Sequence, residues 1–140
     1  MAHIYIIYNA DSTAMGKIKY ACTKIMSSAS DSPCSACDLT HNGLHLNETA
    51  EWSVAKKRIG GAEVQQLHRD ELSVELKQFI DLEKVKLPVV LGKESMEGTL
   101  KVLMTKEELG LCSKDHEKFL ASLQKNASAQ SIALDVQSKI

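Results

Sequence analysis

The sequence predicts an α/β protein in three layers, α/β/α, with a four-stranded mixed sheet in the middle. Three observations predict this class. Residues 3–8 form a nearly continuous apolar and aromatic run, which is typical of a buried central strand. Helical patterns separate that run from a second strand-like segment, 62–68, so these two strands should be parallel. Segments 87–91 and 99–104 follow each other across a short turn, which indicates a hairpin.

The segment between the first two strands is expected to hold three helices. Residues 9–13 break the first strand and offer several N-cap side chains for a first helix, which should end in the Ser-rich stretch 27–31. Ser32-Pro33 predicts the start of a short helical turn, and Gly43 its end. A second long helix should end at Gly60-Gly61, with an apolar face of Trp52, Ala55 and Ile59.

The second half of the chain alternates between helix and strand patterns. A third helix should present Leu72, Leu76, Phe79 and Ile80 to the core. Pro88 opens the third strand, and residues 92–98 predict the hairpin turn. Thr105 and Glu108 predict a capping box for one last helix. The apolar face of that helix is Leu109, Cys112, His116, Phe119, Leu120 and Leu123.

We expect one domain over residues 1–125 and a C-terminal tail over residues 126–140. In the tail, Ile132, Leu134 and Val136 alternate with polar residues, so the tail either adds a strand or stays loose. A chain of 140 residues is the usual size of one domain and is long enough to bury a core without disulfides.

Composition excludes several classes of partner. The net charge of −1 gives no electrostatic basis for binding nucleic acid or an anionic membrane. No apolar run approaches the ~20 residues that a membrane span needs, and residues 1–8 lack a basic segment typical of export signals. We therefore expect a cytoplasmic protein, where reducing conditions favour redox or metal chemistry for its cysteines over structural disulfides.

Most of the reactive side chains lie between residues 33 and 45. Cys34 and Cys37 form a C-x-x-C pair, and His41 and His45 follow. With Pro33 as first helical residue, Cys34 lies where the helix dipole favours a thiolate, and Cys37 lies one turn later on the same face. This spacing suits attack by one sulfur and resolution by the other.

The same residues also suit a metal site. Cys34, Cys37, His41 and His45 supply four ligands within twelve residues, and two thiolates with two imidazoles suit zinc. Gly43 lies between the two histidines and disfavours one continuous helix there, so a set of Cys34, Cys37, His41 and the distant His68 remains an alternative.

A second titratable cluster, His68-Arg69-Asp70-Glu71, follows the second strand. His68 is either a general base or ligand, or a solvent-capped strand end, while Asp70 is expected to be a helix N-cap. Because ligands of open α/β sheets bind at the carboxyl ends of the strands, His68 and Asp11 are expected at the functional edge. Cys22, Cys112, His116 and Trp52 are expected in or beside the core, and the charged run 56–58 on a solvated face.

The order of elements, with Pro88 directly before the third strand, resembles the thioredoxin-like fold. In that family the matching proline is usually cis and lies beside the redox cysteines. Family members usually place C-x-x-C directly after the first strand, whereas here residues 9–12 occupy that place and the cysteines follow an extra helix. The segments Tyr8-Asn9-Ala10, Cys34-x-x-Cys37 and Leu67-His68-Arg69-Asp70 also resemble those of a group of small proteins without a known activity.

The sequence thus favours a thiol-redox protein in which Cys34 is the nucleophile, Cys37 the resolving thiol and His41 or His68 the proton carrier. Its partner would be a small molecule or a protein thiol. A zinc-binding protein that uses the same cysteines with histidines is the first alternative. A non-enzymatic interaction module, whose cysteines only stabilise a loop, is the second.

Overall fold

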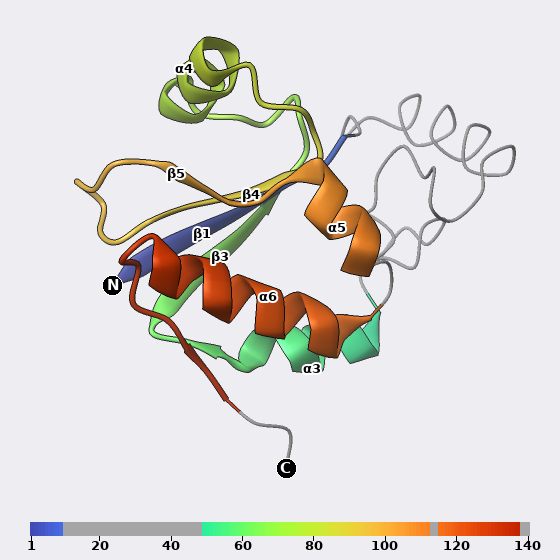
Figure 1. Ribbon diagram of the computed structural model, residues 1–140. Coiled ribbons are helices and arrows are strands. Elements are labelled where there is room, and N and C mark those ends of the chain that lie inside the picture. Colours follow the sequence, from blue (N-terminus) through green and yellow to red (C-terminus); the bar gives the residue numbers. More distant parts are fainter. Residues whose placement is uncertain (10–48, 113–114, 138–140) are drawn as a thin grey trace, which may run out of the picture.

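A computed structural model describes residues 1–9, 49–112 and 115–137. Its centre is a four-stranded sheet in the order β3-β1-β4-β5 (Figure 1). The strands are β1 (Ala2–Ile7), β3 (Ala62–Leu67), β4 (Val89–Lys93) and β5 (Lys101–Met104). β1 runs parallel to β3 and antiparallel to β4, and β4 runs antiparallel to β5. The predicted α/β class and four-stranded mixed sheet are confirmed.

Side chains alternate along β1 and so divide the core between the two faces of the sheet. Ile4, Ile6 and Tyr8 point to the face that carries α3 (Ala50–Lys57), α5 (Lys106–Cys112) and α6 (His116–Ala129). Tyr5 and Ile7 point to the opposite face, which carries α4 (Val74–Glu83) (Figure 1). All residues of β1 are buried, as expected for a central strand.

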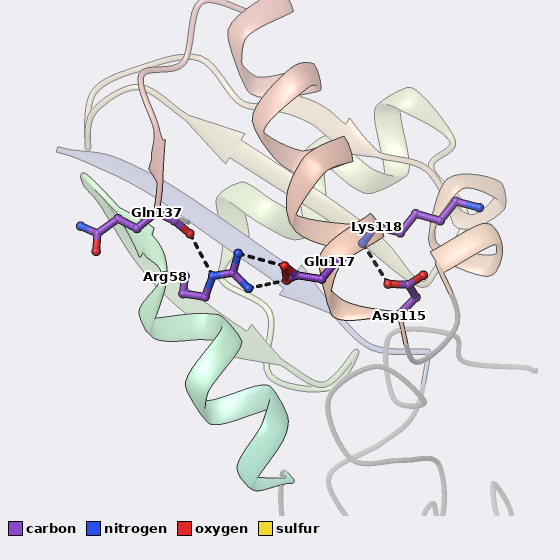
Figure 2. Close-up of polar contacts among 5 residues, drawn as sticks. All are labelled: Arg58, Asp115, Glu117, Lys118 and Gln137. Atoms are coloured by element: carbon purple, nitrogen blue, oxygen red, sulfur yellow. Dashed lines mark hydrogen bonds and ion pairs between the residues drawn. The ribbon is translucent and has the colours of Figure 1, made fainter. Parts of the chain in front are cut away.

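The C-terminal segment returns to the three-helix face. After α6 the chain forms β6 (Asp135–Val136), which pairs with β2 (Ile59–Gly60) in a separate two-stranded sheet. Arg58 holds this arrangement together (Figure 2). Its guanidinium makes two contacts with the carboxylate of Glu117 on α6, and its Nε donates to the carbonyl of Gln137 at 2.9 Å.

Two of the predicted boundaries, at Ile59 and at Gly92, are wrong. Ile59 belongs to β2 and not to the preceding helix, which ends at Lys57. Gly92 lies within β4 and not in the hairpin turn. A Cβ at Gly92 would lie 2.5 Å from Leu103 Cδ1, so glycine serves a close approach of side chains inside the sheet.

The predicted last helix is two helices. α5 ends at Cys112, and α6 begins at His116 with Asp115 as its N-cap, whose carboxylate accepts from Lys118 N at 3.0 Å. The apolar spacing continues across this break, so periodicity alone could not locate it. The capping box at the start of α5 is confirmed, since Glu108 N donates to Thr105 Oγ1 at 3.2 Å and Thr105 N donates to Glu108 Oε1 at 3.1 Å.

The Leu87–Pro88 peptide bond, directly before β4, is cis. Within the described residues, no helix combines the length and the apolar character that crossing a membrane requires.

Candidate functional site

The carboxyl ends of the two parallel strands β1 and β3 lie side by side. The strand register pairs Ile7 with Leu67, so Tyr8 and His68 follow at the same edge of the sheet. Their rings contact each other edge to face, with 5.1 Å between the ring centroids. This is the edge at which open α/β sheets bind their ligands, and it is where His68 was predicted to lie.

A tight turn after β3 places a carboxylate on the imidazole of His68. Glu71 N donates to the carbonyl of His68 at 2.9 Å, which closes the turn. Glu71 Oε1 then lies 2.8 Å from the backbone N of His68 and 2.7 Å from its Nδ1. One carboxylate oxygen therefore binds both the backbone and the side chain of the same histidine.

These hydrogen bonds decide the protonation of the pair. The backbone N–H of His68, followed by its side chain, lowers the pKa of the Glu71 carboxyl below its ordinary value of 4.5, and partial burial opposes this shift. An ionised carboxylate only accepts hydrogen bonds, so Nδ1 carries the proton. In the neutral ring the lone pair is then on Nε2, which makes no hydrogen bond within the described part of the chain.

A second chain of hydrogen bonds reaches the same edge from α3. Lys56 Nζ donates to Gln66 Oε1 at 2.8 Å, and Gln66 Nε2 donates to the hydroxyl of Tyr8 at 2.7 Å. The Tyr8 side chain is buried, so this contact satisfies a polar atom that burial would otherwise penalise.

Trp52 of α3 and His116 of α6 form an aromatic contact on the three-helix face. Trp52, on the first turn of α3, is fully buried, and its ring contacts His116 at the start of α6 with 5.7 Å between centroids. The expected core position of Trp52 is confirmed, and His116 is half-buried at the boundary. The indole Nε1 of Trp52 is buried and has no hydrogen-bond partner among the residues that the structure describes.

The predicted site residues have different outcomes. Cys34, Cys37, His41 and His45 lie outside the described residues, as do Asp11 and Cys22. Among residues 1–9, 49–112 and 115–137, no three His, Cys, Asp or Glu side chains are grouped so that they could hold a metal ion. Asp70 is not the helix N-cap, because Ser73 has that role and its hydroxyl accepts from Leu76 N at 3.3 Å.

Cys112 is a core residue, as predicted. It is buried on α5, and this burial raises the pKa of its thiol above the ordinary value of 9.0, although a hydrogen bond with Ser122 opposes the shift. A thiol with a raised pKa forms little thiolate at neutral pH, so Cys112 is a poor nucleophile.

Sequence reasoning missed the partners of His68 and Tyr8. Lys56 was expected on a solvated face, but it is half-buried and bonds to Gln66. The spacing of His68 and Glu71, three residues apart after a strand, is the one local signal that could have indicated their contact. Comparisons with protein-family models, with curated proteins and with solved structures found no match.

Proposed function

We propose that this chain is a small thiol-redox protein in which Cys34 and Cys37 exchange a disulfide with a partner and His68 carries the proton. The observation that carries the proposal is the His68–Glu71 pair at the carboxyl edge of β3. A histidine with its Nδ1–H held by a carboxylate presents Nε2 as the acceptor and donor of protons near neutral pH. The side chain of His68 is 26% exposed, so solvent and a ligand can both reach it.

The fold gives independent support. A parallel pair, β1 and β3, next to the antiparallel strands β4 and β5 is consistent with the expected resemblance to the thioredoxin-like fold. Pro88 directly precedes β4, which is the place of the proline in that family. The C-x-x-C pair comes after an extra segment, so the roles of the two cysteines rest on their spacing and not on the family position.

The proposed reaction is a two-electron exchange with a disulfide. The Cys34 thiolate attacks one sulfur of the substrate disulfide, which breaks the S–S bond and releases the other sulfur as a thiolate. That thiolate takes a proton from the imidazolium of His68. His68 then removes the proton of Cys37, whose thiolate attacks the sulfur of Cys34 and breaks the mixed disulfide. The second substrate sulfur leaves as a thiolate and takes that proton from His68. The substrate disulfide is reduced to two thiols, and Cys34 and Cys37 become a disulfide.

The first test is a redox titration of the purified protein with mixtures of reduced and oxidised glutathione. Mass spectrometry after alkylation should find a disulfide between Cys34 and Cys37. The Cys34→Ser variant should not form this disulfide, whereas Cys112→Ser, a matched control that removes a buried thiol, should form it as the wild type does. No Cys34–Cys37 disulfide at any potential would contradict the proposal.

The second test addresses His68 through the rate of thiol exchange with a small aromatic disulfide. In His68→Gln the rate should fall by about 100-fold or more, because the proton carrier is lost. Glu71→Gln should lower the rate less, because it removes only the carboxylate that holds Nδ1–H and orients the imidazole. Equal losses in both variants would mean that the pair only supports the turn.

A zinc-binding function is the second candidate, because the same His68–Glu71 contact is the arrangement that orients metal-ligating histidines. Cys34 and Cys37 would then be ligands together with His41, His45 or His68. Metal analysis of protein purified without added metal separates the two functions. About one zinc per chain, lost in Cys34→Ser and retained in Cys112→Ser, would favour the zinc site over the redox reaction.

A further inference from the structure

The two edges of the four-stranded sheet differ in their protection. β5 has four residues and begins with Lys101, whose Nζ donates to the carbonyl of Gln130 at 2.7 Å, and its register with β4 shifts between Val90 and Leu91. Short strands, lysines and bulges are the usual means of keeping an edge from pairing. β3 has six residues in regular register with β1 and contains neither lysine nor proline.

The outer side of β3 offers backbone groups for pairing. Ala2 N donates to the carbonyl of Gly61 and Tyr8 N to that of Leu67, so the odd-numbered residues of this segment face β1. Backbone groups alternate in direction along a parallel strand, so those of Ala62, Val64 and Gln66 point outward. Within the described part of the chain these outward groups have no backbone partner. The open stretch ends at His68, whose N–H is already bound by Glu71.

We propose that this edge pairs antiparallel with β3 of a second copy of the chain, about a two-fold axis at Val64. This interaction surface is independent of the proposed redox function. The two sheets would join into one continuous sheet, with residues Ala62 and Gln66 of one copy opposite Gln66 and Ala62 of the other. The three outward residues of each copy would exchange about six N–H···O hydrogen bonds across the two-fold axis.

Side-chain charges select this register over its neighbours. With the axis at Val64, each exposed Glu63 carboxylate lies opposite the exposed amide of Gln65 in the other copy, which can donate to it. An axis at Glu63 would place two carboxylates opposite each other, which is repulsive. An axis at Gln65 would place Glu63 opposite the apolar Leu67. Only the first register places each Glu63 carboxylate opposite a hydrogen-bond donor, and it does so twice by symmetry.

A matched pair of substitutions at Gln65 tests this register. Sedimentation equilibrium of the full chain, with reductant present to prevent disulfide-linked dimers, should show a reversible dimer for the wild type. Gln65→Lys places a cation opposite Glu63 and should tighten the dimer, and Gln65→Glu places a like charge there and should weaken it. Each change acts at two symmetric pairs, so the dissociation constant should move by between about 2-fold and about 30-fold in either direction.

Amide exchange gives a second readout of the edge itself. The amides of Val64 and Gln66 should exchange more slowly as the protein concentration rises, and Gln65→Glu should remove that dependence at equal concentration. Because Gln65 is exposed, both variants should fold, and their free energies of unfolding as monomers serve as the control. A chain that stays monomeric up to about millimolar concentration, or a dimer that responds equally to both substitutions, would overturn the proposal.

Discussion

The two faces of the sheet are built differently. One face is covered by α3, α5 and α6, and its core includes large side chains that are completely buried, among them Trp52 and Phe119. Among residues 1–9, 49–112 and 115–137, the other face is covered by α4 alone, whose buried residue is Leu76, while Phe79 and Ile80 remain half-exposed. Several helices exclude water from the centre of a face, whereas one helix leaves its flanks in contact with solvent.

Each face also has its own charged contact to the rest of the molecule. On the three-helix face Arg58 ties α3 to α6 and to the C-terminal segment at the surface (Figure 2). On the α4 face Lys93, which is 3% exposed, donates to Glu75 at 2.8 Å and lies 5.9 Å from the centre of the Tyr5 ring. The α4 face therefore contains a buried charged side chain, whereas Arg58 makes its charged contact at the surface of the three-helix face.

The largest expected difference concerns the two phenylalanines of the chain, one on each face. Phe119→Ala should destabilise the protein by about 3–5 kcal/mol, because it empties a fully buried position on α6. Phe79→Ala on α4 should cost roughly half as much, because its ring already contacts water. Urea unfolding followed by circular dichroism measures both. Equal losses would contradict the view that the α4 face is thinly packed.

The contact between Lys93 and Glu75 gives the next largest effect. Glu75→Gln should destabilise by about 1.5–3 kcal/mol, because it weakens the charged hydrogen bond and leaves the ammonium buried without its counterion. Lys93→Met should cost less, since it removes the charge together with its need for a partner. The two variants are compared by the same urea titration at neutral pH, and a larger loss for Lys93→Met would refute this account.

The pH dependence of this contact follows from the direction in which Glu75 shifts the pKa of Lys93. The hydrogen bond with Glu75 raises the pKa of Lys93 above its ordinary value of 10.5, although burial opposes the shift. Its contribution is therefore complete below pH 10.5 and is lost as the pH rises through the folded pKa. The stability gap between the wild type and Glu75→Gln should be constant near neutral pH and should narrow above pH 10.5.

A smaller effect is expected for Arg58 on the three-helix face. Arg58→Lys should cost about 1 kcal/mol, because lysine cannot make the two-pronged contact with Glu117 and reach the carbonyl of Gln137 as well. Amide exchange should show the loss mainly at Val136 in β6. Lys57→Ala, an exposed neighbour, is the control and should leave the exchange at Val136 unchanged.

The helix N-caps should give the smallest difference between the faces. Asp115→Ala at α6 should cost up to about 1 kcal/mol, and Ser73→Ala at α4 about half of that. Both caps accept one backbone N–H, at 3.0 Å and 3.3 Å respectively, but the aspartate also places a charge at the positive end of the helix dipole. Thermal unfolding compares the two variants. A larger loss of stability for Ser73→Ala than for Asp115→Ala would contradict the role given to the aspartate charge.

The sequence by itself determined the features that depend on neighbouring residues. The apolar run of β1 predicted a buried strand, and Thr105 with Glu108 predicted a capping box, because a continuous apolar run and an i,i+3 hydrogen bond are both local. The position of His68 at the carboxyl edge also followed, since it depends only on strand direction.

Only the tertiary structure decided the rest. Gly92 reads as a turn residue until Leu103 and Ile4 are seen to pack where its side chain would be. The hydrogen-bond chain from Lys56 through Gln66 to Tyr8 joins residues up to 58 positions apart. Its cause is burial: the Tyr8 hydroxyl is enclosed by the fold and must find a partner there, and a sequence pattern does not record which distant donor the packing brings to it.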